Sequence, residues 1–390
     1  MELQNQLCMR CHLQGVNVLN EGASFFDFKP SDKISDHWNI FLPKFDGKND
    51  KFLMASQADR MVQSKCYIET QQLSCITCHN PHISVKETPA AQFNAACINC
   101  HQPNKNDCTE TIAVRLTNND NCSACHIPKS GAIDIPHVSI SDHKIQIPGE
   151  AVKMGDGKFI GLVSLTTDKP DALLMARGYL HYFESFNSDR ALLDSVKYYL
   201  DKTSEKNDSY SAVLIHYYYL QQDFNKIISA SKAFKKITTL DAWTAYRIGE
   251  AFLNTQSYTE AAKYFEQAVN EEKYNLDYNF KLATAKIFSG KAEEAEKLLR
   301  FIVTENPTYH MAWNNLGVLQ AGKGNYQEAE KSFVKAIQLD PDYVLARIKL
   351  AELYIATRQR TKAREAVSYL EKYYPDLQEL PKLTLQLRSI

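Results

Sequence analysis

Residues 75–79 read Cys-Ile-Thr-Cys-His, and the same C-x-x-C-H pattern recurs at residues 8–12, 97–101 and 122–126. Two thiols at this spacing can form thioethers with the two vinyl groups of one porphyrin, and the histidine that follows can bind the iron. We therefore predict four covalent c-type haems. Their thioethers would come from Cys8, Cys11, Cys75, Cys78, Cys97, Cys100, Cys122 and Cys125, and their proximal iron ligands would be His12, His79, His101 and His126.

Two other uses of paired cysteines compete with haem. Cys75, Cys78, Cys97 and Cys100 also fit the C-x₂-C-x₁₈-C-x₂-C spacing of a zinc site. Alternatively, the cysteines could form a disulfide scaffold. Neither zinc nor disulfides require a histidine directly after the second cysteine, whereas all four pairs have one, so the pattern favours haem.

The histidines outside the motifs are candidate distal ligands. Eight of the eleven histidines precede residue 150, and four of these eight are the proximal set. The others, His37, His82, His137 and His143, match the number needed for bis-histidine ligation. Such iron is six-coordinate and passes electrons. Met9, Met54 and Met61 are rival axial ligands, although methionine more often serves in packing.

Cysteines outside the motifs and the sparse aliphatic residues complete the prediction for this part of the chain. Cys66 and Cys108 are the two cysteines that remain outside the motifs. An even number of remaining cysteines predicts a disulfide in an oxidising compartment, and two separate thiols are the alternative.

One attachment motif per roughly thirty residues leaves little room for an ordinary core. We expect short helices and loops wrapped around closely packed porphyrins.

Composition excludes several classes of protein. The 390 residues carry a net charge of −1, with 44% hydrophobic and 23% charged residues, and all ten cysteines precede residue 126. The charge balance does not point to nucleic acid, so no nucleic-acid partner is expected. The sequence contains no run of about 18 apolar residues, so no membrane span is expected. The chain therefore reads as two different soluble parts joined end to end.

A 34-residue period organises the rest of the chain. Alanine recurs at positions 261, 295, 329 and 363, while residues 313–341 fit the tetratricopeptide pattern W-x₂-L-G…A-x₃-F…P. Small residues let the two helices of each hairpin cross closely. Regular repeats are predicted at 208–241, 242–275, 276–309, 310–343 and 344–377.

We predict a mainly α protein with three segments. Residues 1–147 form a tetrahaem cytochrome domain with little regular structure, and residues 148–170 form a linker that packs an extended strand. Residues 171–390 form a tetratricopeptide α-solenoid, whose first repeat, 171–207, is degenerate and whose last residues, 378–390, make a capping helix. The groove of such an array usually binds a protein or peptide partner.

The cysteine-rich part resembles the bacterial multihaem cytochromes c with doubled C-x-x-C-H motifs. The resemblance rests on residues 60–66, 75–82, 125–128 and 136–143, within roughly residues 1–150. It implies periplasmic or extracellular electron transfer, and distal histidines after Asn-Pro and Ile-Pro. This part of the chain is similar to tetrahaem cytochromes and to pentahaem nitrite reductases. It lacks the C-x-x-C-Lys haem site of the nitrite reductases, which argues against nitrite reduction.

The start of the chain lacks the signal peptide that such a location requires. Residues 1–7 contain neither a basic region nor an apolar stretch, and the first motif begins at residue 8. We expect this start to result from processing or from a truncated gene model.

Three functions follow as hypotheses. The first is a non-enzymatic electron relay through four haems, with redox partner proteins as donor and acceptor and the repeat array docking a partner. The second is a redox enzyme acting on a small nitrogen or sulfur compound at one open haem. The third is a structural adaptor whose haems serve stability.

Overall fold

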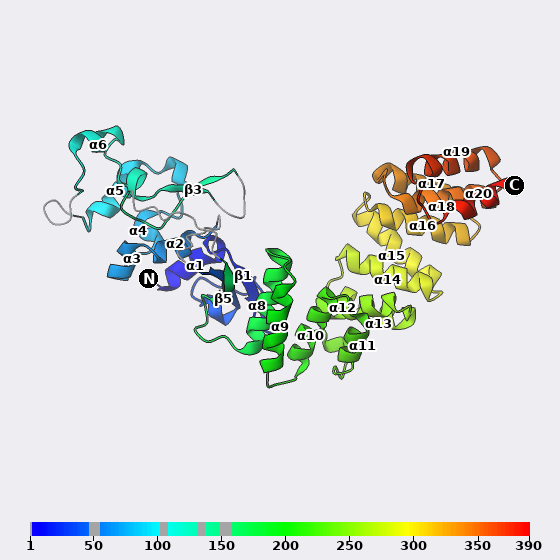
Figure 1. Ribbon diagram of the computed structural model, residues 1–390, viewed down its shortest axis with the longest axis horizontal. Helices are drawn as coiled ribbons and strands as arrows, with labels where there is room; N and C mark the ends of the chain where they lie inside the picture. The colour runs from blue at the N-terminus through cyan, green and yellow to red at the C-terminus, as the bar shows by residue number, and fades with distance from the viewer. Residues whose placement is uncertain (1, 47–54, 102–107, 132–136, 149–157) are drawn as a thin grey trace. The chain divides into compact units, whose positions relative to one another are not determined.

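The computed structural model describes residues 2–46, 55–101, 108–131, 137–148 and 158–390. Contacts divide the chain into two compact units, Met1–Ser204 and Glu205–Ile390. Helices dominate the structure, as the sequence predicts (Figure 1). No helix in the described ranges is long and apolar enough to cross a membrane.

The N-terminal unit combines short helices with a small sheet. Its elements in chain order are α1 (Glu2–His12), β1 (Val16–Leu19), η1 (Ile34–Asp36), β2 (Trp38–Phe45), α2 (Gln57–Val62), α3 (Lys65–Thr70), α4 (Cys75–Cys78), η2 (Val85–Glu87), α5 (Ala90–Ile98), α6 (Ile112–Thr117), α7 (Cys122–His126), β3 (Lys129–Gly131), β4 (Ser139–Ser141), β5 (Phe159–Ser164), α8 (Ala172–Ser185) and α9 (Ala191–Lys202).

Three antiparallel strands, in the order β1-β2-β5, form a sheet that the sequence analysis did not predict as a whole. Only the extended segment between residues 148 and 170, where β5 lies, was expected. One face of the sheet has its own hydrophobic cluster, so residues 13–46 and 55–58 do not depend on porphyrins for a core, contrary to the prediction. The cluster consists of Leu13, Phe28, Ile34, Trp38, Ile40 and Ala58.

Helix α8 packs on the sheet, within the N-terminal unit. Phe41 of β2 is completely buried, and a Cβ on Gly178 would lie 3.1 Å from its ring. The Arg177 guanidinium donates to the carbonyl of Leu19 at 2.6 Å, and the Leu162 N–H donates to the Tyr179 hydroxyl at 3.3 Å. These contacts tie the first helical hairpin, α8–α9, to the sheet. The boundary between the two compact units accordingly falls after residue 204, whereas the repeat array is predicted to start at residue 171.

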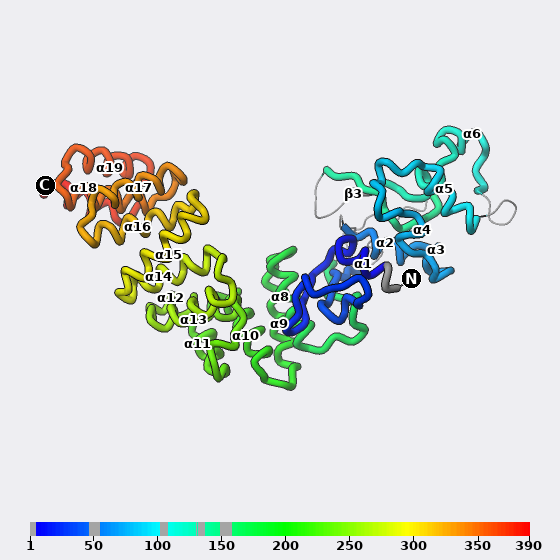
Figure 2. Tube along the Cα trace, turned by 180° about the vertical axis from the view of Figure 1, so that it is seen from behind, coloured from blue at the N-terminus to red at the C-terminus, as the bar shows by residue number. Residues whose placement is uncertain are grey.

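The C-terminal unit is a succession of helical hairpins (Figure 2). The first helix of each hairpin starts on the first residue of a predicted repeat, and α20 lies in the predicted cap. The elements are α10 (Asp208–Leu220), α11 (Phe224–Ser231), η3 (Ile237–Thr239), α12 (Ala242–Asn254), α13 (Tyr258–Glu271), α14 (Leu276–Phe288), α15 (Ala292–Glu305), α16 (His310–Gly322), α17 (Tyr326–Leu339), α18 (Val344–Ala356), α19 (Arg360–Tyr373) and α20 (Leu380–Arg388).

Glycine permits the close crossing within two of these hairpins. A Cβ on Gly249 would lie 2.7 Å from the ring of Phe265, and one on Gly317 would lie 2.6 Å from the ring of Phe333. Both phenylalanines are buried, and the alanines at the recurring positions are completely buried. The residues that carry the 34-residue period therefore form the core of the solenoid.

Replacing Gly317 with valine is expected to destabilise the C-terminal unit by roughly 3 kcal/mol, because the new side chain overlaps a packed ring. Thermal unfolding followed by circular dichroism measures the loss. Gly322→Ala is the matched control in the same helix, since no atom lies within 4 Å of its added Cβ. A Gly317→Val variant as stable as this control would contradict the packing described here.

Candidate functional site

The four motifs lie on or directly after short helices of the N-terminal unit. The first motif ends α1, the second forms α4 with its histidine just after it, the third starts at the end of α5 and runs past it, and the fourth forms α7. Residues three apart share one face of a helix, so helical geometry puts the two thiols of the first, second and fourth motifs on the same side. The histidine of each motif then follows the second thiol.

The first and second motifs meet through their first cysteines. Helix α1 packs against α4, and the thiols of Cys8 and Cys75 lie close together. The backbone N–H of Cys75 donates to Asn5 Oδ1 at 3.1 Å, and Asn5 is itself buried. Burial, followed by the neighbouring Cys8, raises the pKa of Cys75 to about 12. The thiol therefore stays protonated at neutral pH.

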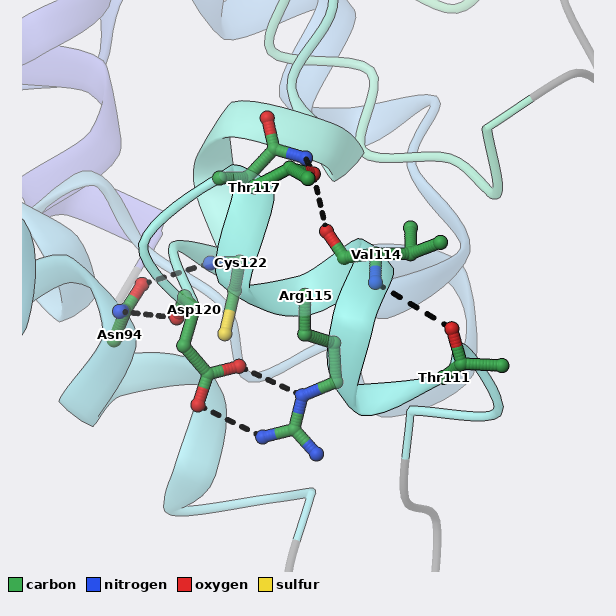
Figure 3. A network of polar contacts seen from close by, with 8 residues as sticks. Asn94, Thr111, Val114, Arg115, Thr117, Asp120 and Cys122 are labelled. Atoms are coloured by element: carbon green, nitrogen blue, oxygen red, sulfur yellow. Dashed lines mark hydrogen bonds and ion pairs between the residues drawn. The ribbon is translucent and has the colours of Figure 1, made fainter.

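The third and fourth motifs meet in the same way. Helix α5 packs against α7, so that Cys97 lies close to Cys122, and burial followed by this neighbour raises the pKa of Cys97 to about 11. The backbone N–H of Cys122 donates to Asn94 Oδ1 at 3.0 Å (Figure 3). Asn94 also donates to the Asp120 carbonyl at 3.1 Å, and the Asp120 carboxylate makes an exposed bidentate pair with Arg115 at 2.7 and 2.8 Å. The four motifs thus form two similarly built pairs.

A third contact joins the two pairs of motifs. Helix α4 packs against α5. The thiol of Cys97 interacts with those of Cys78 and Cys66, and Cys66 also interacts with Cys100. Burial raises the pKa of both Cys66 and Cys78. The attachment sites therefore adjoin in the order first, second, third, fourth.

Cys66 and Cys108, the predicted disulfide partners, are free thiols in the structure, as are the other eight cysteines. Cys66 is half-buried among cysteines of the second and third motifs, and Cys108 is exposed. Their pairing remains a prediction.

The histidines of the four motifs, which are the predicted proximal ligands, differ in the contacts that orient their rings. His126 Nδ1 lies 2.9 Å from the carbonyl of Gln146, which can only accept, so the ring donates from Nδ1 and leaves Nε2 for a metal. His12 Nδ1 lies 3.4 Å from Gln57 Oε1. The His79 ring contacts Phe93 edge to face at 5.5 Å, and His101 is exposed.

Among the distal candidates, His143 lies against a proximal histidine. The rings of His143 and His79 are 6.0 Å apart, and their planes differ by 25°. At this separation the two imidazoles could hold one haem iron between them, with His79 supplied by the motif and His143 from elsewhere in the chain. His143 Nδ1 donates to the Ser141 carbonyl at 3.1 Å, leaving Nε2 as the acceptor.

Burial lowers the pKa of both of these histidines. For His79 the cause is burial, followed by the nearby His143 and His12. For His143, too, burial is the largest cause of the lowered pKa, and nearby His12 lowers it further. The hydrogen bond with Ser141 and the charge of Asp142 act in the opposite direction and raise the pKa. Both rings are consequently neutral at pH 7, the form that binds a metal.

His37 faces a different partner. Its Nε2 lies 2.9 Å from Asp32 Oδ2, and its ring packs edge to face on Phe28 at 5.6 Å. A backbone hydrogen bond from Lys29, together with His37, lowers the pKa of Asp32. His37 would have to leave this carboxylate, or use Nδ1, to bind iron.

The remaining axial candidates show no comparable arrangement. His82 and His137 are exposed, and His137 has a left-handed backbone with φ of +62°. Met61 is buried and Met9 packs on the cluster below the sheet, in keeping with a packing role. Met54 lies outside the described residues.

Apolar surface in this region fits a bound porphyrin. Among the described residues from 62 to 161, no hydrophobic side chain is buried. Large hydrophobic side chains are instead exposed around the motifs, and a haem would cover them. They are Ile68, Ile76, Ile83, Val85, Ile98, Ile112, Val114, Leu116 and Ile147.

The zinc alternative fits less well. In the part of the chain that the structure describes, no three side chains of histidine, cysteine, aspartate or glutamate gather into a site that could hold a metal ion. Cys75, Cys78, Cys97 and Cys100 therefore do not form a tetrahedral set.

Sequence reasoning assigned no role to the residues that hold these motifs. Asn5 and Asn94 each stand three residues before the first cysteine of a motif, which was a readable signal. Arg60 and Asp142 entered only through the family resemblance, and their contact spans 82 residues. Gln146 carried no signal, because it acts through its backbone carbonyl.

Comparisons with protein families match both parts of the chain. The doubled CXXCH motif family matches residues 69–106, and tetratricopeptide repeat families match residues 244–274 and 310–343. The tetratricopeptide part is thereby confirmed, as is a cytochrome c type of haem-binding motif.

Individual relatives are distant. Human protein O-mannosyl-transferase TMTC3 is 31% identical over 159 residues, which cover 39% of this chain but 17% of that protein. Among solved structures, YrrB, a TPR protein with an unusual peptide-binding site, has a TM-score of 0.38 and 20% identity, covering 55% of this chain and all of YrrB. PilF of Pseudomonas aeruginosa has a TM-score of 0.41 and 13% identity, covering 54% of this chain and 97% of PilF.

Proposed function

Starting from a chain that joins a multihaem cytochrome c to a tetratricopeptide array, we propose that it relays electrons through four c-type haems. The adjoining order of the attachment sites carries this proposal. Helix α1 of the first motif packs against α4 of the second, α4 packs against α5 of the third, and α5 packs against α7 of the fourth. Porphyrins attached at neighbouring thiols lie close together, which is what electron transfer between them requires. When bound, each haem supplies an iron that accepts and returns one electron.

The eight motif cysteines would hold the porphyrins and the four motif histidines would bind iron on the proximal side. We propose His143 as the distal ligand opposite His79, on the strength of their ring separation. His37, His82 and His137 remain the proposed distal ligands of the other three haems. Six-coordinate iron of this kind has no open position, so the relay needs no substrate site.

The tetratricopeptide array would bring a redox partner protein to the relay. Such repeats serve protein–protein interaction, and the array places a cavity of about 340 Å³ between α15, α16 and α17. Its lining combines the Glu296 carboxylate, which pairs with both Arg300 and Lys323, with the apolar surface of Trp313 and Leu316. A protein segment with apolar side chains would fit it.

The proposed location is the periplasm or the cell exterior, where covalent haem attachment is typical. The proposed domain division stays at 1–147, 148–170 and 171–390, with α8–α9 as the degenerate first repeat packed on the sheet.

One observation favours a second candidate function. The Asp32 carboxylate engages His37 Nε2, so the haem that His37 was expected to complete could have an open position. A haem of that kind would support a redox enzyme acting on a small nitrogen or sulfur compound. Carbon monoxide binding by the reduced, unmodified protein distinguishes the two functions, because only an open iron binds it.

Expression together with a haem-ligation system is expected to yield a chain carrying four covalent haems. Intact-mass spectrometry of the denatured protein counts them, since thioethers survive denaturation. Replacing both cysteines of one motif, for instance Cys122 and Cys125 with alanine, should reduce the count by one. A chain without covalent haem, or one that binds zinc instead, would overturn the proposal.

A further inference from the structure

A buried ion pair lies beside the candidate ligand His143. Arg60 on α2 donates from Nε and from one terminal nitrogen to the two carboxylate oxygens of Asp142, at 2.7 and 2.6 Å. The two side chains are only 3% and 7% exposed. Removing two charges from water is costly, so a buried pair is retained only with good geometry and further hydrogen bonds. The paired fork of arginine provides that geometry.

The carboxylate of Asp142 organises the turn that carries His143. Asp142 Oδ1 accepts the backbone N–H of Lys144 at 3.0 Å, and the backbone N–H of Asp142 donates to the Pro128 carbonyl at 2.8 Å. Within the same turn, the Ser141 carbonyl accepts from His143 Nδ1. The side chain and backbone of Asp142 therefore hold the residues on both sides of the histidine.

The same segment also orients a proximal histidine. The carbonyl of Gln146 accepts from His126 Nδ1, and the Gln146 backbone N–H donates to the His126 carbonyl at 3.1 Å. Residues 141–146 thus touch the fourth motif through His126 and the second through the His143–His79 contact. A shift of this segment would disturb both.

We propose that Arg60 and Asp142 are positioning residues, whose ion pair sets His143 at ligand distance from the iron opposite His79. The proposal rests on the proposed function, because it takes His143 to be a distal ligand. Neither residue touches the porphyrin in this account; each acts through the 141–146 segment. Preorganising a metal ligand through its neighbours in this manner is how outer contacts tune metal sites.

The test is the double variant Arg60→Met, Asp142→Asn in the full haem-loaded chain. Removing both charges leaves no unpaired ion in the interior, so folding and attachment of the haems should persist. The released segment should let His143 leave the iron. We expect a high-spin ferric signal, and carbon monoxide binding by the reduced protein that rises from near zero towards about one per chain.

Three further variants separate the explanations. His143→Ala shows the full effect of losing the ligand. Arg60→Lys keeps the charge but loses the paired fork, so it should open the iron partially even if the double variant folds poorly. The control Lys197→Met, Asp201→Asn removes an exposed ion pair on α9, outside the attachment motifs. It should leave all haems low-spin.

The outcomes are distinct. If His143→Ala opens one iron while the double variant and Arg60→Lys stay low-spin and do not bind carbon monoxide, the positioning role is overturned and the ligand assignment stands. If His143→Ala itself leaves every haem low-spin, the assignment of His143 as a ligand is wrong, and the positioning proposal falls with it.

Discussion

Without haem, residues 62–148 are expected not to fold, while residues 205–390 fold normally. The described residues from 62 to 161 bury no hydrophobic side chain, so this region has nothing to offset the entropy of ordering its backbone, about 1–2 kcal/mol per residue. The C-terminal unit, in contrast, has hydrophobic clusters of its own. In the haem-free chain, the first region should therefore be unfolded while the C-terminal unit is folded.

Amide hydrogen exchange on a chain expressed without haem-ligation machinery measures this difference. Amides of residues 62–148 should exchange at the rate of an unfolded chain, and those of α12–α19 should be protected. The haem-loaded chain is the control, in which both regions should be protected. Protection of the second to fourth motifs in the haem-free chain would show that the porphyrins are not their core.

Replacing His143 with alanine is expected to open one of the four irons. The thioethers and the proximal His79 remain, so four haems should still be attached, but one should become five-coordinate. The reduced variant should bind about one carbon monoxide per chain, where the unmodified relay binds almost none. Loss of a strong imidazole donor to ferric iron should also raise the potential of that haem.

Absorption and electron paramagnetic resonance spectra, with a carbon monoxide titration, record the change. His310→Ala serves as the control, because His310 belongs to α16 of the repeat array. A variant that remains entirely low-spin would contradict the ligand assignment. Carbon monoxide binding by the unmodified protein would instead favour the enzyme.

Local signals in the sequence were enough to predict much of this molecule. The C-x-x-C-H spacing is a property of five adjacent residues, and the 34-residue period arises because every hairpin repeats the same packing. Phe265 and Phe333 are buried where that period puts them, against Gly249 and Gly317. Helix starts at residues 242 and 310 follow from the same repeat.

Contacts between distant residues could not be predicted in this way. Strand β2 pairs Phe41 with Ser164 across more than a hundred residues, and neither strand reads as part of a sheet without the other. The same holds for His79 and His143, or Arg60 and Asp142, which only the folded chain brings together. The sheet was missed for a second reason: β2 is buried on both faces, so Trp38-Asn39-Ile40-Phe41 lacks the alternation typical of a surface strand.

The central claim is that the iron atoms form a relay of six-coordinate centres. Quantitative electron paramagnetic resonance of the oxidised, haem-loaded protein tests it most directly, with the haem count from mass spectrometry as the reference. The account predicts about four low-spin ferric centres per chain and no high-spin signal. A stoichiometric high-spin signal in the unmodified protein would contradict it.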